Sequence, residues 1–567
     1  MGHSHTTVSP DRSALKSPVP DIHPDPDIAA ALRVVEVNAT IAGRLTDIVE
    51  RRLAAGRDES VLAWARVTAA FATTNPTGDL RNVKVEEALD AVARRALPVS
   101  RERLPVADPA TVLHVLSESH LIGGHVRMAG RWAGIDHRQP RFVITRPGCD
   151  GGELRRVAAA LGTGVDVLTG PSMLGRAGQL RALAATADVV VCHTHGEDPV
   201  PTVAFGGDYS GPPIVMVNHA DHVFWLGTGN VSTIAQLRRT GADVTADARG
   251  YPSRTFASLP IPMDLVNRHS DRREAKQALG LDRDRVVALT LARPTKYAPS
   301  VFHPGFLDVV EPVFAQSDAL LLAVGPSVDD QEWAAAAARL GHRARFIGLQ
   351  RDPNPYLDAA DVYLDSFPFC SNTSMLEAAT RGLPIVTSRQ HRSLQRLHGS
   401  EGVLDGAVIG PATTGEYRAM LARLLVDADL RASAGRRAFD AMLAQHGPEA
   451  WQRLLEGVYR HAMAAKPEVE RIEPTGSSTD QLREYAAVLH GIESASPLMW
   501  TLNGTLEAFD RADRISLRSR LVAARALMRA RGAVPTGGDL AWLLLPSWSG
   551  SGRSTPARLR RSSAVAR

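Results

Sequence analysis

The stretch AADVYLDSFPFCSNTSMLEAATRGLPIVT, residues 359–387, reads as a strand, a loop, a helix and a second strand. Val362–Leu364 and Ile385–Thr387 are the two short apolar runs at strand length. Between them, residues 371–374 offer several N-cap side chains for a helix, which Gly382 and Pro384 end. This succession predicts one β-α-β step of a parallel sheet.

An anion site is expected where this helix begins. The unpaired backbone N–H groups and the dipole of a helix N-terminus favour phosphate, and Asn372, Thr373 and Ser374 add polar side chains there. Glu377 follows one turn later, where a carboxylate is placed to accept hydrogen bonds from a ribose diol. We therefore expect these four residues to bind a nucleotide.

Apolar runs of strand length recur along the chain, with amphipathic segments between them. Alternating strands and helices are typical of parallel sheets with helices on both faces. The sequence therefore predicts an α/β protein with two Rossmann-like, doubly wound domains, whose ligands bind at the carboxyl ends of the strands. The runs are Val112–Leu116, Phe142–Thr145, Val165–Leu168, Val189–Cys192 and Ile214–Val217, followed by Val286–Ala292, Leu320–Val324, Arg345–Ile347, Val362–Leu364 and Ile385–Thr387.

Composition and periodicity predict the domain boundaries. The proline-stiffened segment Leu259–Asp264 separates the two groups of strands and is typical of a hinge beside a cleft. Apolar residues at helical spacing predict helical additions at both ends of the chain. The predicted parts are a disordered N-terminus (1–27), a helical accessory module (28–105), two Rossmann-like domains (106–262 and 263–465) and a helical tail with a disordered basic C-terminus (466–567).

Charge and composition narrow the class of protein. The 567-residue chain is 44% hydrophobic and 22% charged, as is ordinary for soluble globular proteins, and a net charge of +4 does not indicate nucleic acid as a partner. Cys149, Cys192 and Cys370 lack disulfide or metal-binding spacing, and no apolar run reaches membrane-spanning length. We therefore expect a cytoplasmic protein. Residues 510–531 carry an arginine-rich face, which is typical either of a packed helix with a solvated basic face or of peripheral contact with anionic lipid at the inner face of the membrane.

Three further stretches accompany residues 359–387. They are HVLSESHLIGGHVRMAGRW (114–132), VMVNHADHVFWLG (215–227) and ALTLARPTKYAP (288–299). In this order they resemble nucleotide-sugar glycosyltransferases of the two-domain GT-B fold, both the group 1 family and the O-GlcNAc transferases. The resemblance extends over roughly residues 110–465. It implies transfer of a hexosyl or N-acetylhexosaminyl group from a nucleotide-diphosphate donor, by default UDP, to an unidentified acceptor, without a bound metal or a further cofactor.

The same resemblance implies roles for residues of the second domain. Lys296 matches the lysine that grips the diphosphate in the O-GlcNAc transferases, and Arg293 matches an arginine of the group 1 pair. The nucleobase is expected against the loop that holds Leu349 and Gln350, where backbone groups bind uracil in the resembled enzymes. Phe369 stands where the group 1 pattern has its first glutamate, which favours kinship with the inverting O-GlcNAc transferases and leaves the anomeric outcome open.

The first domain offers candidates for the acceptor side. Gly123 and Gly124 follow the first predicted strand and let the backbone approach a phosphate or a sugar. His125 comes next, where an imidazole at a helix start can act as a base or bind a sugar hydroxyl. His219 follows another strand of the same domain and is the second candidate, and Asp221 is placed to orient a neighbouring imidazole.

Three alternatives share parts of this pattern. A metal-dependent hydrolase would use the histidines that follow two of the strands, together with nearby carboxylates, as ligands. A nucleotide-sugar 2-epimerase would share the fold and the donor site but need no acceptor. A protein that binds a nucleotide sugar without turning it over is the third alternative. The histidines and acids of the first alternative are His193, His195, His219 and His222 with Glu197, Asp198 and Asp221.

Overall fold

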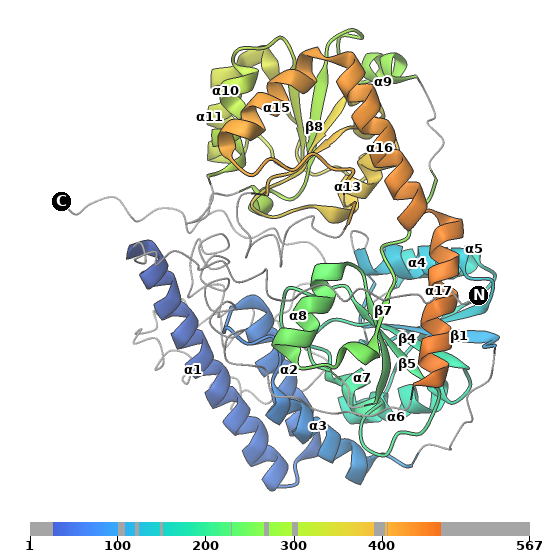
Figure 1. Ribbon diagram of the computed structural model, residues 1–567. Coiled ribbons are helices and arrows are strands. Elements are labelled where there is room, and N and C mark those ends of the chain that lie inside the picture. The colour runs from blue at the N-terminus through green and yellow to red at the C-terminus, as the bar shows by residue number, and fades with distance from the viewer. Residues whose placement is uncertain are drawn as a thin grey trace, which may run out of the picture.

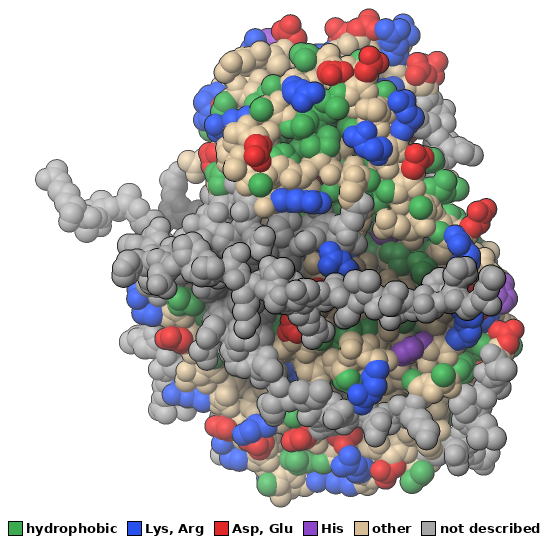
Figure 2. All heavy atoms as spheres, viewed as in Figure 1, with side chains coloured by type: hydrophobic (Ala, Val, Ile, Leu, Met, Phe, Trp, Pro, Cys, Tyr) green, Lys and Arg blue, Asp and Glu red, His purple; other side chains and the backbone are tan. Residues whose placement is uncertain are grey.

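The computed structural model describes residues 26–99, 108–119, 124–147, 151–227, 230–265, 271–297, 304–389, 403–404 and 406–465. They form two α/β domains, one above the other in Figure 1, and each is built around one parallel sheet. Side chains of both charge signs are interspersed over the face shown in Figure 2. Residues 1–25 and the predicted tail with its segment 510–531 lie outside the described residues.

The first domain holds a seven-stranded sheet in the order β3-β2-β1-β4-β5-β6-β7. Its central strands are buried almost throughout, as expected of parallel strands covered on both faces. The strands are β1 (Thr111–Leu116), β2 (Gln139–Ile144), β3 (Val165–Val167), β4 (Val189–His193), β5 (Ile214–Asn218), β6 (Val231–Gln236) and β7 (Phe256–Ser258). Its own helices are α4 (Gly124–Ile135), α5 (Gly152–Ala160), α6 (Met173–Ala184), α7 (Pro199–Ala204) and α8 (Arg239–Arg249).

The second domain holds a five-stranded sheet in the order β10-β9-β8-β11-β12. The strands are β8 (Val287–Leu291), β9 (Leu320–Val324), β10 (Ala344–Phe346), β11 (Val362–Leu364) and β12 (Ile385–Val386). The helices are α9 (Arg272–Ala278), α10 (Phe306–Phe314), α11 (Gln331–Leu340), α12 (Asn354–Ala359), α13 (Asn372–Ala379), α15 (Thr414–Val426) and α16 (Ala428–His446). Apolar clusters on both faces of the sheet make its core.

The N-terminal helices are part of the first domain rather than a separate module. These are α1 (Pro26–Ala54), α2 (Asp58–Thr74) and α3 (Val83–Ala96). Helix α2 is buried almost all round, which is the mark of a core helix, and its Trp64 and Phe71 belong to the same apolar cluster as Leu113 and Val190 of the sheet. Removing these helices would therefore uncover one face of the first sheet.

Within the described residues the chain crosses between the domains twice, and the two crossings are hydrogen-bonded to each other. His446, the last residue of α16, faces the carbonyl oxygen of Ile261 with its Nδ1 at 2.8 Å. Its own carbonyl oxygen accepts a hydrogen bond of 2.8 Å from the backbone N–H of Met263. The segment that enters the second domain and the segment that leaves it therefore lie side by side.

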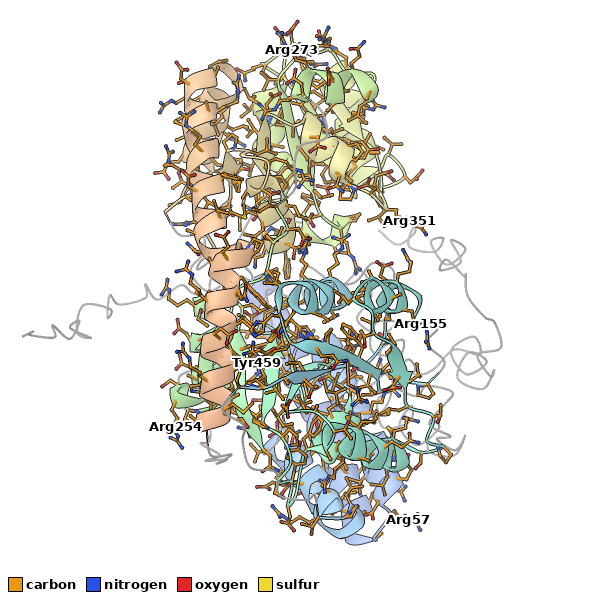
Figure 3. The ribbon with its side chains drawn as sticks, turned by 90° about the vertical axis from the view of Figure 1, so that its right-hand side faces the viewer. Arg57, Arg155, Arg254, Arg273, Arg351 and Tyr459 are labelled. Atoms are coloured by element: carbon orange, nitrogen blue, oxygen red, sulfur yellow. The ribbon has the colours of Figure 1, made fainter. Side chains whose placement is uncertain are left out.

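Helix α17 (Pro448–Ala464) follows the second crossing and runs down beside the first domain (Figure 1). Tyr459, labelled in Figure 3, accepts a hydrogen bond of 2.9 Å from Trp132 Nε1 and donates one of 2.6 Å to Asp136. Trp451 packs in the same apolar cluster as Trp132. Residues 448–464 fall within the range predicted for the second domain, yet they cover the first sheet.

Two parallel sheets flanked by helices confirm the predicted fold class, the two-domain GT-B architecture. A strand is present at each of the ten predicted places. Strands β6 and β7 were not predicted. Strand β6 is buried at every position although it carries Ser232, Thr233 and Gln236, so its polar residues hide the pattern by which a buried strand is recognised.

Candidate active site

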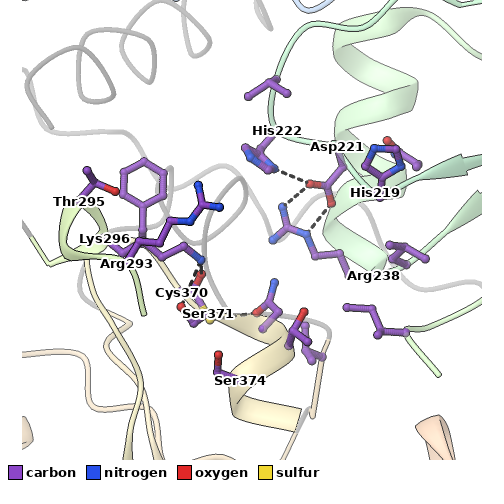
Figure 4. A pocket seen from close by; sticks show the side chains of 18 of the residues that line it. His219, Asp221, His222, Arg238, Arg293, Thr295, Lys296, Cys370, Ser371 and Ser374 are labelled. Carbon is purple, nitrogen blue, oxygen red and sulfur yellow. Dashed lines mark hydrogen bonds and ion pairs between the residues drawn. The ribbon is translucent and has the colours of Figure 1, made fainter. Parts of the chain in front are cut away.

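A cavity of about 450 Å³ lies between the two domains (Figure 4). The second domain contributes the segment after β8, which includes Arg293 and Lys296, and residues 369–374 at the start of α13. The first domain contributes the loop after β5 and Arg238. Both groups stand at carboxyl ends of parallel strands, the usual place for ligands in such sheets.

Thr73 and Pro76, at the end of α2, complete the cavity wall from the N-terminal helices. Thr73 Oγ1 donates a hydrogen bond of 3.2 Å to the carbonyl oxygen of Phe224. A hydrogen bond of 3.0 Å from Gly227 N–H to Glu86 ties the same helices to the loop after β5, and a buried ion pair of 2.8 Å with Arg81 holds Glu86 in place. The local pattern of residues 58–96 does not show that these helices reach the cavity.

Asp365 organises the loop that leads into α13. Its Oδ1 accepts a hydrogen bond of 2.9 Å from the backbone N–H of Ser371, and its Oδ2 accepts one of 3.2 Å from Thr387 Oγ1. Burial raises the pKa of Asp365, and the hydrogen bonds to the carboxylate act against that rise. Asp365 therefore fixes the loop that precedes α13. The first turn of α13, with its free N–H groups, lies at the cavity. Asp365 was not predicted as a site residue.

Lys296 lies against this loop, as Figure 4 shows. Its Nζ donates to the carbonyl oxygen of Cys370 at 3.0 Å and to Ser371 Oγ at 3.1 Å. Burial lowers the pKa of Lys296, the nearby Asp365 raises it and the like charge of Arg293 lowers it. An ammonium group that is already desolvated beside a helix N-terminus is a strong site for an anion.

Three other predicted donor residues line the same cavity. Asn372, Thr373 and Ser374 are partly exposed at the first turn of α13. The exposed Arg293 faces them from the segment after β8. The structure therefore brings together four of the predicted donor-binding residues with Lys296.

Glu377 has a different position. It does not line the cavity described above, and its carboxylate lies 3.2 Å from Arg127 Nη1 and 3.9 Å from Arg131 Nη2, both on α4 of the first domain. Arg131 also contacts Asp264 at 2.9 Å. The carboxylate predicted to bind ribose thus joins the two domains in this structure.

Leu349 and Gln350 stand apart from the cavity lining as well. The Leu349 side chain is 69% exposed, and Gln350 Nε2 donates to the carbonyl oxygen of Ile347 at 3.3 Å. Gly123 lies outside the described residues, and Gly124 is the first residue of α4. For these residues the predicted roles stay predictions.

The first domain packs three imidazole rings together, of which His219 lines the cavity whereas His125 and His195 are not among its lining residues. The His125 ring centroid lies 4.0 Å from that of His219 and 4.8 Å from that of His195. His219 Nδ1 lies 3.2 Å from the carbonyl oxygen of Val217, which suits a tautomer with the proton on Nδ1. Burial and the other imidazoles hold the pKa of His219 well below its ordinary value. His219 is therefore uncharged at pH 7 with a lone pair on Nε2, although the same burial disfavours its protonated form.

His195 is anchored by three charged residues, of which only Glu197 was named from the sequence. Its Nδ1 lies 3.2 Å from Glu118 and 3.6 Å from Glu197, and Arg146 contacts both carboxylates, at 3.3 and 2.5 Å. Burial alone would lower the pKa of Arg146, but the neighbouring carboxylates outweigh it and hold the pKa above its ordinary value. Glu118 and Arg146 each follow a strand end by two residues, which is the signal that would have found them.

Asp221 orients His222 rather than His219. Its carboxylate contacts Arg238 at 2.6 and 3.1 Å and His222 at 3.1 Å, as Figure 4 shows. Burial raises the pKa of Asp221, but Arg238 and His222 outweigh it and hold the pKa below its ordinary value. A Cβ on Gly241 would meet Asp221 Oδ2 at 2.4 Å, so only glycine permits this approach to α8.

The alternative of a metal-dependent hydrolase needs a group of metal ligands. In the described part of the chain, no three His, Cys, Asp or Glu side chains are arranged to hold a metal ion. His193 instead faces His114 at 3.1 Å behind the cavity. Burial lowers the pKa of His114 to about 3 and that of His193 well below its ordinary value. Among the described residues, no helix is both long and apolar enough to cross a membrane.

Residues 298–427 match the family described as glycosyl transferases group 1. The matched residues include the loop after β11 and all of α13, so this part of the second domain is similar to group 1 glycosyltransferases. No curated protein sequence matches the chain.

Solved structures of glycosyltransferases are similar to the chain at low identity. HepE of Anabaena, in complex with UDP and glucose, has 15% identity and a TM-score of 0.48 over 61% of this chain and 98% of its own. A glycosyltransferase from Rickettsia africae has 10% identity and a TM-score of 0.49 over 63% and 100%. A mutant O-GlcNAc transferase of Thermobaculum terrenum has 16% identity and a TM-score of 0.45 over 74% and 84%.

Proposed function

We propose that the protein transfers a hexosyl or N-acetylhexosaminyl group from a UDP-sugar to an acceptor hydroxyl or amine, without a bound metal ion. One observation carries the proposal. A single cavity is lined on one side by Lys296 and the start of α13, and on the other by the neutral His219. Stabilisers for a leaving diphosphate and a proton acceptor therefore face the same space.

The chemistry assigns a task to each side. As the bond between the anomeric carbon and the diphosphate oxygen breaks, that oxygen keeps the electron pair and negative charge grows on it. Lys296, Arg293 and the free N–H groups of α13 stabilise this charge in place of a metal ion. The acceptor atom forms the new bond to the anomeric carbon and gives its proton to His219 or to the neighbouring His125.

The acceptor reaches this point between the first domain and the N-terminal helices. Thr73 and Pro76 lie in the wall on that side, so the helices are positioned to select the acceptor. Cys192 and Cys370 are free thiols, which is in keeping with the proposed cytoplasmic setting.

Calorimetric titration of the metal-free protein with UDP, GDP and ADP tests the donor class, and turnover of UDP-sugars with and without candidate acceptors tests the reaction. We expect UDP to bind in the presence of a chelator and sugar transfer to require an acceptor. Formation of an epimer without acceptor would support the 2-epimerase instead, and UDP binding with no turnover would support the non-catalytic binding protein. Loss of all activity on chelation, restored by zinc, would support the hydrolase.

A further inference from the structure

A second hollow, of about 480 Å³, lies on the far side of the second domain. Its wall includes Asp361, which precedes β11, and Pro384, which precedes β12. It therefore opens at the amino ends of these strands, whereas the donor side of the interdomain cavity lies at carboxyl ends. The two sites therefore lie at opposite ends of the strands of one sheet.

Among the described residues, four arginines and a single carboxylate line this hollow, namely Arg272, Arg381, Arg431 and Arg436 with Asp361. Two of these charges are matched close by. Arg381 pairs with the buried Asp358 at 3.1 Å, and Asp361 pairs with the buried Lys276 at 2.7 Å. The lining therefore has three positive charges in excess, those of Arg272, Arg431 and Arg436.

Arg272 adds an unsatisfied hydrogen-bond donor. Its Nη1 lies at 3.4 Å from Asp361 Oδ1, and its buried Nε has no hydrogen-bond acceptor among the described residues. A buried guanidinium N–H without an acceptor is unfavourable. An anion seated beside Arg272 would supply the missing acceptor.

Helix α16 supplies the remaining groups. Arg431 and Arg436 line the hollow from it, together with Ala428 and Phe439. Arg431 Nη1 donates to the carbonyl oxygen of Leu424 at 2.7 Å, which fixes its guanidinium near the base of the helix. The wall thus combines fixed and exposed cations with an aromatic ring, and its size suits a small phosphorylated molecule.

We propose that this hollow binds a small anion with at least two negative charges, of the diphosphate or phosphorylated-metabolite class, independently of the donor site. Arginines recognise phosphate oxygens through paired N–H groups, and the excess charge favours a multiply charged anion over a single one. The site does not depend on the identity of the sugar donor.

Inorganic pyrophosphate is the probe, and full-length protein is titrated by calorimetry. The variant Lys296→Ala first removes the cation of the proposed donor site, so that binding at the hollow is measured separately. In that background we expect pyrophosphate to bind more tightly than phosphate and to bind less tightly as salt rises. Adding Arg436→Gln should weaken it about tenfold or more, the effect of losing one charged hydrogen bond.

Arg437→Gln is the matched control, because Arg437 is the next residue on α16, is exposed and does not line the hollow. It should leave pyrophosphate affinity within twofold. Arg272→Gln gives a second test, and Arg436, which is exposed, keeps the test valid if the Arg272 variant does not fold. Absence of pyrophosphate binding in the Lys296→Ala protein, or equal affinity in the Arg436 and Arg437 variants, would overturn the proposal. Neither result bears on UDP binding in the unmodified protein.

Discussion

Replacing Lys296 with alanine should abolish most of the sugar transfer while leaving the fold intact. In the structure Nζ lies 3.0 Å from the carbonyl oxygen of Cys370 and 3.1 Å from Ser371 Oγ, so a diphosphate oxygen at the start of α13 can come to about the same distance. At ~3 Å and an effective dielectric constant of ~20, a unit charge pair attracts by roughly 5 kcal/mol before solvation is counted.

Most of that attraction should be realised in the transition state. Lys296 is already removed from water in the free protein, and this burial lowers its pKa. The ammonium group therefore loses little further hydration when the diphosphate arrives. We expect Lys296→Ala to reduce kcat/KM for the UDP-sugar by about 100- to 1000-fold, which corresponds to roughly 3–4 kcal/mol and is typical of losing one fixed electrostatic stabiliser.

Stability should respond in the opposite sense, or not at all. The lowered pKa means that folding disfavours the charged form of Lys296, so the alanine variant should unfold at a Tm equal to or above that of the wild type. A lowered pKa means that Lys296 loses its proton at a lower pH than an ordinary lysine does. As pH rises, the UDP affinity of the wild type should therefore begin to fall at a pH below the ordinary pKa of lysine.

The assay pairs initial rates of UDP-sugar turnover with thermal unfolding on the same preparation. Lys84→Ala is the matched control, because the Lys84 side chain is 65% exposed on α3 and stands outside the cavity lining. Turnover of Lys296→Ala within about threefold of the Lys84 control would refute the reasoning and would remove Lys296 from the site.

Three further predictions concern Glu377, the imidazole cluster and His446. If Glu377 leaves Arg127 and binds the ribose when UDP is present, Glu377→Gln should weaken UDP binding about tenfold or more in calorimetry. Arg127→Gln should not weaken it. Equal UDP affinity in the two variants would mean that Glu377 only joins the two domains. His219→Asn should leave UDP affinity within twofold but slow transfer about 100-fold. Because the pKa of His219 is lowered, the wild-type rate should fall only below pH 6.5. An unchanged transfer rate in His219→Asn would leave His125 as the base. Burial lowers the pKa of His446 to about 4, so the folded protein takes up this proton at a lower pH than the unfolded chain does. The free energy of unfolding should therefore fall by about 3 kcal/mol from this group as pH falls from 6.5 to 4. Urea unfolding of His446→Gln should show a smaller loss, and an identical loss would contradict the assignment.

The sequence predicted the parallel strands well, because each buried strand is a short apolar run that ends in a loop of polar residues. The position of Lys296 and the start of α13 at the cavity follows from the same pattern, since residues after a strand lie at the carboxyl end of the sheet; their roles stay predictions. Strand β7 escaped prediction because Phe256–Ser258 contains one large apolar side chain, Phe256, and so gives no apolar run.

Long-range packing explains the rest of what was missed. Nothing in the local pattern around Glu377 signals that Arg127 and Arg131 of another domain reach it. The partners of His195, namely Glu118 and Arg146, come from separate strand ends, so no short motif contains them. The helices before residue 97 have ordinary amphipathic spacing, and only their contacts with the sheet reveal that they belong to the first core.

The position of α17 has a consequence for biosynthesis. Val112 and Val191 on one face of the first sheet, together with Trp132 of α4, are covered by α17, notably by Trp451 and Leu455. A ribosome that has finished the first sheet must still translate the whole second domain before it reaches these two residues, which takes about ten to forty seconds at ~5–20 residues per second. Throughout that interval the nascent first domain carries an open apolar face, so this protein should engage chaperones during translation and should aggregate when synthesis stops short of residue 448.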